Sequence, residues 1–453
     1  MRHKLFVANR GEIALRIIRS AQELGLETVL GVSSADVDSV GAQRADRVVV
    51  LGPAPARDSY LDAALVVHAA RETGCTALHP GYGFLSERAE LAELCRREGL
   101  IFVGPGPESI RAVGDKLSAR ALARQAGVPL TSGSEKVGDV AQALTIAQDI
   151  GYPVITKASA GGGGRGMVVA YGPDDLKTSF DQASTTAREA FGDGTLYLER
   201  YVEVARHVEV QVVGDGEGRI VHFGERDCSV QRRYQKMIEE APAAILPPEV
   251  RSRLQEAAIS LLSSINYRNA GTVEFLYDVE RQDFFFMEVN ARIQVEHPVS
   301  EEITGVDLVA AQLRLATGTG SLPDQAQVQT HGHAIEVRII AEDPENDFAP
   351  SPGRITRWEP PVGKGIRIDS AAQAGTLVSP YYDSMIAKLI VHADNREAAV
   401  ALLADALDAF VIEGIATNIP LLREIVAHED YRANAINTRW LETTFLPNRQ
   451  TAR

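Results

Sequence analysis

The chain has 453 residues, of which 45% are hydrophobic and 24% are charged, and its formal net charge is -15. This composition is typical of a globular enzyme with more than one domain. The negative charge argues against nucleic acid or an anionic membrane as a partner, because both would repel the chain. No apolar run approaches the ~20 residues that a membrane helix needs.

The three cysteines are Cys75, Cys95 and Cys228. They are scattered, odd in number and contain no CxxC pair, so they predict neither a disulfide framework nor a zinc site. A reduced, cytoplasmic setting fits this cysteine usage best.

The first hundred residues alternate between strand and helix patterns. Residues 4–8 and 28–32 are predicted strands, and the apolar spacing across 12–24 predicts a helix between them. This βαβ opening predicts a parallel sheet, which strand-like segments at 76–78 and 101–103 would continue. A domain boundary is expected near 104–115.

The rest of the chain has a different texture. From about residue 150 the chain becomes rich in strands, which predicts an α+β domain with antiparallel pairing; the segments are 153–159, 195–201, 207–213, 219–224, 272–277 and 284–295. From about residue 333, strands accompany an alanine-rich helix at 396–410, and a polar tail follows. The predicted fold class is therefore a mixed α/β and α+β multidomain protein.

A glycine run follows a predicted strand that carries a lysine. Lys157 lies on the strand, and residues 161–164 are all glycine. Consecutive glycines expose N–H groups that can wrap phosphate oxygens, and a lysine adds positive charge. The GK[ST] ending of a Walker A loop is missing. A flexible hairpin tip is the alternative, and the lysine favours phosphate binding.

Residues 225–236 hold four cations within a few residues of one another: Arg226, Arg232, Arg233 and Lys236. A solvated charged strand and a basic ligand site both fit this segment.

Residues 287–296 alternate apolar and polar side chains without a break. In an extended strand all five polar side chains would share one face. Glu274 precedes this stretch, and a hairpin through residues 276–284 would bring it back alongside. Two carboxylates and an amide oxygen suit a hard cation such as Mg²⁺. Arg292 offers a planar fork for an oxyanion, and Glu296 could act as a base.

The stretch therefore predicts the metal and anion site of an ATP-consuming enzyme that activates a small oxyacid. Its alternative is the solvent-facing side of an antiparallel strand. Read singly, four other residues have ordinary structural roles. His207 would be a satisfied strand histidine, Arg338 would pair with Glu336, Tyr82 would pack in a loop, and Lys116 would begin a helix at the surface.

Together these segments resemble the biotin carboxylase component of biotin-dependent carboxylases, a family with an ATP-grasp fold. The resemblance runs in order from residue 4 to about 443. Its motifs are Ala8–Ala14, His79–Ser86, Gly114–Lys116, Lys157–Met167, Arg226–Lys236, Glu288–Pro298 and Tyr381–Met385.

The resemblance implies a Rossmann-like N-terminal domain at 1–114, a central ATP-grasp domain at 115–325 with a mobile lid at about 130–202, and a biotin carboxylase C-terminal domain at 326–446. A polar tail at 447–453 would follow. The implied reaction uses ATP and bicarbonate to carboxylate biotin on a carrier protein through carboxyphosphate. It is the first half-reaction of an acyl-CoA, pyruvate or related carboxylase.

The resemblance also implies roles for individual residues. Contacts to ATP would come from Lys116, Lys157, Gly163, Gly164, Met167, Glu199, Arg200, Tyr201, Val202, His207, Gln231, Tyr234, Glu274 and Glu288. Mg²⁺ or Mn²⁺, at two sites, would be held by Glu274, Glu288 and Asn290. Bicarbonate would be bound by Lys236, Arg292, Gln294, Val295 and Glu296. Tyr82 and Arg338 would bind biotin, and the catalytic set would be Lys236, Arg292, Glu296 and Arg338.

The chain departs from the family pattern at Tyr234, where a histidine is usual, and at Lys364, where a dimer contact usually has an aromatic residue. Arg19, Glu23 and Arg367 match the other dimer positions, so a homodimer is expected. The sequence contains no Met-Lys-Met biotinylation motif. The biotin carrier and the carboxyltransferase are therefore expected on separate chains.

Two alternatives remain at this point. One is another ATP-grasp carboxylate–amine ligase, which would leave Arg338 and the His79–Ser86 loop unexplained. The other is a non-catalytic nucleotide-binding subunit, for which Tyr234 is the only support.

Overall fold

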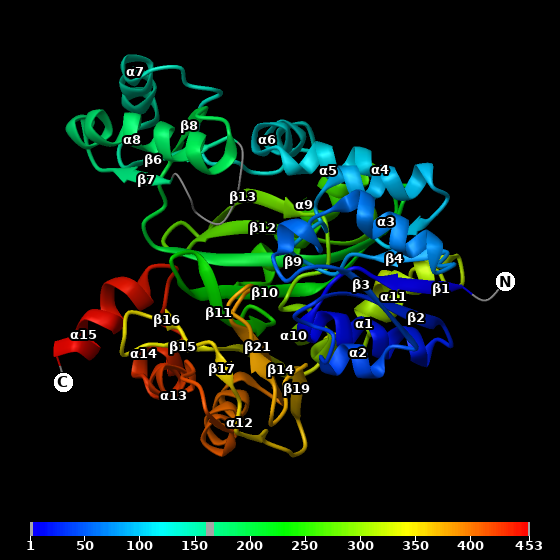
Figure 1. Cartoon of the computed structure of the whole chain (residues 1–453). Coiled ribbons are helices and arrows are strands. Elements are labelled where there is room, and N and C mark those ends of the chain that lie inside the picture. Colours follow the sequence, from blue (N-terminus) through cyan, green and yellow to red (C-terminus); the bar gives the residue numbers. More distant parts are fainter. Residues whose placement is uncertain (1–2, 160–166, 452–453) are drawn as a thin grey trace.

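The computed structural model describes residues 3–159 and 167–451. Its N-terminal segment is a five-stranded parallel sheet in the order β3-β2-β1-β4-β5 (Figure 1). The strands are β1 (Lys4–Val7), β2 (Glu27–Ser33), β3 (Arg47–Gly52), β4 (Ala77–His79) and β5 (Ile101–Phe102). The predicted βαβ opening and parallel sheet are confirmed.

Helices cover both faces of this sheet, which explains why its strands are apolar throughout. Leu5 and Val7 share one core with α1, whereas Phe6 lies in a second core with α3 and α4. The helices of this segment are α1 (Gly11–Glu23), α2 (Val40–Arg44), α3 (Ala63–Glu72), α4 (Ala89–Arg97) and α5 (Pro107–Gly114).

A second, eight-stranded antiparallel sheet forms the centre of the molecule. Its order is β13-β12-β9-β10-β11-β14-β21-β19, so β11 and β14 join the central and C-terminal parts of the chain in one sheet. The strands are β9 (Ala205–Asp215), β10 (Ile220–Arg232), β11 (Gln235–Ala241), β12 (Arg268–Asp278), β13 (Asp283–Asn290), β14 (His333–Ile340), β19 (Ile366–Ser370) and β21 (Met385–Ala393).

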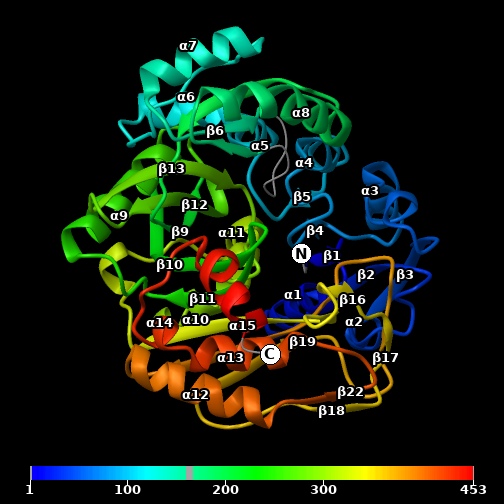
Figure 2. The same ribbon diagram turned by 90° about the vertical axis from the view of Figure 1, so that its left-hand side faces the viewer.

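A small three-stranded sheet with its own hydrophobic core stands apart from the large sheet, at the upper left of Figure 1. Its strands β6 (Val154–Ala158), β7 (Val168–Ala170) and β8 (Leu196–Arg200) pair antiparallel, and two helices, α7 (Val140–Ile150) and α8 (Pro173–Phe191), pack on them. This unit occupies the range predicted for the lid. Figure 2 shows it above the large sheet, with α12 at the opposite end.

The remaining helices flank the large sheet. They are α6 (Lys116–Gln125), α9 (Pro248–Ser263), α10 (His297–Thr304), α11 (Leu308–Thr317), α12 (Arg396–Ala409), α13 (Ile419–Ala427), α14 (Glu429–Arg432) and α15 (Leu446–Thr451), with short helical turns at η1 (Ala56–Asp58), η2 (Gln325–Gln327) and η3 (Leu441–Phe445). Two-stranded ribbons are formed by β15 (Glu342–Asp343), β16 (Ala349–Pro350), β17 (Gly353–Arg354), β18 (Arg357–Glu359), β20 (Leu377–Val378) and β22 (Val411–Glu413). Among the described helices, none has the length and apolar character that crossing a membrane requires.

Candidate active site

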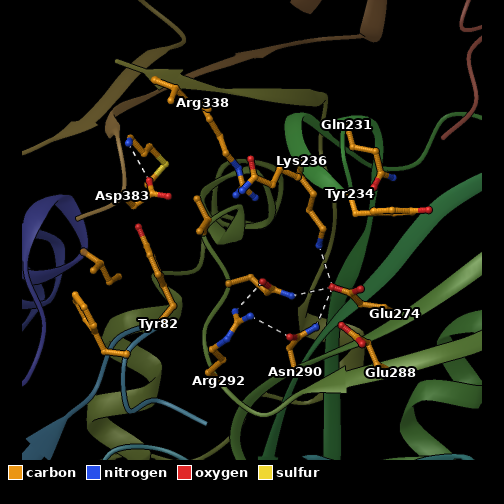
Figure 3. A pocket seen from close by; sticks show the side chains of 18 of the residues that line it. Tyr82, Gln231, Tyr234, Lys236, Glu274, Glu288, Asn290, Arg292, Arg338 and Asp383 are labelled. Carbon is orange, nitrogen blue, oxygen red and sulfur yellow. Dashed lines mark hydrogen bonds and ion pairs between the residues drawn. The ribbon is translucent and has the colours of Figure 1, made fainter. Parts of the chain in front are cut away.

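A cavity of about 580 Å³ lies where loops of the N-terminal segment, the large sheet and β6 meet (Figure 3). It is lined by most of the residues predicted to bind ligands: Tyr82, Lys116, Lys157, Met167, His207, Gln231, Tyr234, Lys236, Glu274, Glu288, Asn290, Arg292, Gln294, Val295 and Arg338. Its described lining does not include Glu199, Arg200, Tyr201, Val202 or Glu296. Gly163 and Gly164 lie outside the described residues.

The lining also contains residues that the sequence analysis did not assign to a site. Asn9–Ile13 and Tyr382–Met385 belong to motifs that carried the family resemblance, so that signal was available. Gln235 likewise lies in the motif Arg226–Lys236, whereas Tyr197 and Ile340 carried no comparable signal.

The predicted strand over residues 284–295 is wrong beyond Asn290, where β13 ends. Residues 291–296 form an irregular loop that leads into α10. Their alternation has another cause: Ala291 is buried in the core under the large sheet, and Ile293 in the core shared with α1. Arg292 and Gln294 line the cavity from this loop and not from the face of a strand.

Lys236 lies at the centre of the site and is surrounded by carboxylates. Its Nζ donates to Glu209 Oε2 at 2.6 Å, to Glu296 Oε1 at 2.6 Å and to Glu274 Oε1 at 2.9 Å. Burial by itself lowers the pKa of Lys236, but these three carboxylates raise it well above the usual value. The residue is therefore a permanent cation. Glu209, fully buried on β9, was missed because a lone glutamate between valines predicts no contact.

The segment 225–236 is not a solvated strand, which was one of its two interpretations. Arg226 is 0% exposed and donates to Glu209 Oε1 at 2.6 Å, so it supports the carboxylate that Lys236 contacts. The segment comprises β10, a turn and β11, and it places Gln231 and Lys236 at the cavity.

Glu296 is fully buried immediately before α10, between two cations. Its second oxygen accepts from Arg338 Nη2 at 3.0 Å, and Lys236 holds the first. Burial raises the pKa of Glu296, but Lys236 and Arg338 outweigh it and hold the pKa below its usual value. The group is therefore ionised at neutral pH, as a general base must be. Both cations line the cavity, so an anion bound between them would lie beside the carboxylate.

Arg338 does not pair with Glu336, as its position on the same strand face suggested. Its Nε donates to Glu239 Oε1 at 2.6 Å, and its Nη2 reaches Glu296. Arg338 contacts Glu239 because β11, which carries Glu239, pairs with β14, which carries Arg338.

Two glutamates that line the cavity suit a divalent cation. Glu274 on β12 and Glu288 on β13 are direct cross-strand neighbours, which confirms the predicted hairpin. Burial and the adjacent Glu274 both raise the pKa of Glu288. Asn290 Nδ2 donates to Glu274 Oε1 at 2.9 Å. Adjacent carboxylates, one buried and one half-buried, with an amide beside them are the oxygen donors that Mg²⁺ or Mn²⁺ takes, and a cation would relieve their repulsion.

A second group of cations lies on β6 and α6, next to Glu199 of β8. Lys157 Nζ on β6 lies 3.1 Å from Glu199 Oε2, and Arg120 Nη1 on α6 lies 2.9 Å from Glu199 Oε1. Burial lowers the pKa of Lys116 at the start of α6, in the same lining. Lys116 begins a helix as predicted but faces the cavity and not bulk solvent. Glu199 thus holds Lys157 in place, and Arg120 was not anticipated.

His207 and Arg292 are also engaged inside the site. His207 Nε2 lies 3.0 Å from Glu274 Oε2, so it is a partner of the acidic pair and not an isolated strand residue. Arg292 lies 3.0 Å from Glu87 and donates to Gln294 Oε1 at 2.8 Å. Its guanidinium is oriented by Glu87, Gln294 and Asn290 together, and Figure 3 shows its contact with Asn290.

A buried acid behind the site provides a test of this electrostatic description. Glu336 is fully buried beside Glu239, and neither of its oxygens has a hydrogen-bond partner among the described residues. Burial raises the pKa of Glu336 well above its usual value, and Glu239 adds to this. The folded state therefore keeps a proton that the unfolded state loses as pH rises above ~4.3.

We expect Glu336→Gln to raise the free energy of unfolding at pH 8 by at least about 1 kcal/mol, since glutamine needs no proton. The advantage over the unmodified protein should grow as pH rises from 5 to 8. Denaturant unfolding across this range measures it, with Glu256→Gln on the exposed side of α9 as the control. A difference that stays constant with pH would contradict the assignment.

Comparison with known proteins agrees with this geometry. Three family models match in succession: "Biotin carboxylase, N-terminal domain" over residues 1–110, "Carbamoyl-phosphate synthase L chain, ATP binding domain" over 115–323, and "Biotin carboxylase C-terminal domain" over 336–443. Biotin carboxylase 1 of Bacillus subtilis is 48% identical over 441 residues, which cover 97% of this chain and 98% of that protein.

Solved structures give the same result. The biotin carboxylase domain dimer of Hydrogenobacter thermophilus 2-oxoglutarate carboxylase, in complex with MgADP, ADP and bicarbonate, matches with a TM-score of 0.93 at 45% identity, covering 98% of this chain and 97% of that one. A biotin carboxylase complex with a β,γ-ATP ligand from Campylobacter jejuni matches with a TM-score of 0.95 at 43% identity, covering 97% and 98%. Three family models in succession and relatives that match along almost the whole length show that the chain belongs to the biotin carboxylase family of ATP-dependent ligases.

Proposed function

We propose that this chain uses ATP to carboxylate biotin with bicarbonate, and that the residues around Lys236 and Glu296 perform the first chemical step. The observation that supports this most directly is Glu296, a buried carboxylate held ionised between Lys236 and Arg338, two cations that line the cavity. Bicarbonate is a weak nucleophile until it loses its proton. The two cations attract the anion, and the carboxylate between them removes its proton.

Each bicarbonate-binding residue has a separate task in this proposal. Lys236 and Arg292 bind the anion, with Gln294 and the Val295 backbone completing the pocket. Glu296 takes the proton, and a bicarbonate oxygen then attacks the γ-phosphorus of ATP while the bond to ADP breaks. The carboxyphosphate formed in this way splits into CO₂ and phosphate beside biotin. Arg338 would stabilise the enolate of biotin, and Tyr82 would lie next to it.

Glu274, Glu288 and Asn290 would hold Mg²⁺ or Mn²⁺, at two sites. The cation would neutralise phosphate charge on ATP. Lys116 and Lys157 would contact the phosphates, Met167, His207, Gln231 and Tyr234 would line the nucleotide site, and Glu199–Val202 would meet the adenine. Lid closure over the phosphates would keep water from carboxyphosphate.

The proposal is tested by following ADP release from the purified chain with Mg²⁺. We expect hydrolysis that depends on bicarbonate and rises when free biotin or a biotinylated carrier is added. ADP release that depends on an amine and ignores biotin would identify a carboxylate–amine ligase instead. Tight ATP binding without hydrolysis under any of these conditions would point to a non-catalytic subunit.

We also propose that the chain acts as a homodimer. The Hydrogenobacter relative is a domain dimer. In this chain α1 lies against β19, its Arg19 and Glu23 are exposed, and the loop before β19 exposes 89% of Val362 beside Lys364. An apolar side chain so exposed, next to charges of both signs, suits an interface that is buried between copies.

The carrier and the carboxyltransferase are proposed as partners supplied from outside this sequence, which has no Met-Lys-Met motif. A cytoplasmic location is proposed from the three free, buried cysteines among the described residues. The final acceptor is set by the carboxyltransferase, and acyl-CoA, pyruvate, other oxo acids and urea are all compatible with this chain.

A further inference from the structure

We propose that Lys388 is a positioning residue for the reaction, which holds the backbone before the base Glu296 and, through Glu12, the hydroxyl of Tyr82. This inference rests on the roles proposed above for Glu296 and Tyr82. Lys388 itself does not line the cavity and touches no substrate position.

Lys388 joins three distant parts of the chain at one buried point. Its side chain on β21 is 0% exposed. Its Nζ donates to the Val295 carbonyl at 2.9 Å, lies 3.2 Å from Glu12 Oε1 at the start of α1, and lies 3.9 Å from Asp369 Oδ2 on β19. Burial lowers the pKa of Lys388, but the surrounding carboxylates raise it above the usual value, so the group carries its charge.

The contact with the Val295 carbonyl acts directly on the base, because this carbonyl belongs to the peptide that begins Glu296. Lys388 is the cross-strand neighbour of Arg338, which holds the Glu296 carboxylate. Two neighbouring cations on one face of the sheet therefore hold Glu296: Arg338 contacts its side chain, and Lys388 contacts the backbone just before it. The described loop 291–296 pairs with no strand, so these two contacts fix its position.

The second contact extends the effect toward the proposed biotin site. Glu12 Oε1 accepts from both Lys388 and the Tyr82 hydroxyl. The ammonium thus fixes the acceptor that orients Tyr82, and Tyr82 lines the cavity. A lysine that served only to neutralise Glu12 and Asp369 would need no contact with Val295, and burying such a charge is costly.

The test separates positioning from charge balance. Lys388→Met leaves Glu12 buried without its cation, so this variant can fail to fold. The double variant Lys388→Met/Glu12→Gln removes both charges and keeps the volume. We measure its thermal unfolding and its bicarbonate-dependent ATP hydrolysis without biotin, which excludes effects through Tyr82. Lys177→Met, on the exposed side of α8, is the matched control.

We expect the double variant to unfold close to the temperature of the unmodified protein, with a KM for bicarbonate raised about tenfold or more and a KM for ATP changed less than about twofold. A bicarbonate KM equal to that of the control would overturn the positioning role. An equal rise of the KM values for bicarbonate and for ATP would also overturn it, because it would indicate that the whole active site had become less ordered. An unmodified protein without bicarbonate-dependent hydrolysis would overturn the proposed function itself, which is a different failure.

Discussion

Replacing Glu296 with glutamine is expected to lower the rate of bicarbonate-dependent ATP hydrolysis by at least about 100-fold, because the amide cannot accept the proton of bicarbonate. The substitution preserves the size of a side chain that is 0% exposed. Because Lys236 and Arg338 hold the pKa of Glu296 below its usual value, the unmodified enzyme should keep this base ionised down to acidic pH. Steady-state ADP release at saturating bicarbonate measures the effect.

The control for this prediction must show that the ATP site is intact. The Glu296→Gln variant should bind ATP with Mg²⁺ as tightly as the unmodified protein, since Glu296 contacts Lys236 and Arg338 whereas Lys157 is held by Glu199. Glu256→Gln, exposed on α9, should leave turnover unchanged. Full turnover in the Glu296→Gln variant would mean that another group takes the proton.

Replacing Glu288 with glutamine is expected to raise the Mg²⁺ concentration needed for half-maximal hydrolysis by at least about tenfold. The variant loses one of two adjacent carboxylates, and glutamine offers only a neutral oxygen. Titration of activity with Mg²⁺ at fixed ATP gives this value.

Stability provides a second measurement that does not depend on turnover. Burial and Glu274 raise the pKa of Glu288, so without metal the pair destabilises the folded protein at neutral pH. The metal-free Glu288→Gln variant should therefore melt at a higher temperature than the metal-free unmodified protein, and it should gain less on addition of Mg²⁺. An equal gain in both proteins would place the cation elsewhere.

Much of this site could be predicted because its ligands lie close together in sequence. Glu288 and Asn290 are two residues apart on β13, and a short hairpin brings Glu274 opposite Glu288. Such local relations follow from strand geometry alone. The same reasoning failed just beyond Asn290, where the alternating pattern continues but the strand does not. Burial in two different cores produces the same pattern as a strand.

The residues that were missed share a different property. Glu209, Arg120 and Lys388 are isolated charges, and each is buried against a partner far away in sequence. A single charged residue on a strand or a helix is usually solvated or part of a local ion pair, so nothing in the sequence assigns it a function. Its burial becomes visible only when the sheets and helices are assembled.

The parallel βαβ opening, the antiparallel centre, the motifs of the family and the chemical kinds of group at the site could all be predicted from the sequence, because they depend on local periodicity and on residue type. The pairing of the charges depends instead on the assembled fold. This fold directed Arg338 to Glu239 and Glu296 and away from Glu336, and it placed Lys236 among three carboxylates. The reason is physical: the pKa and the partner of a buried charge depend on which groups surround it in space.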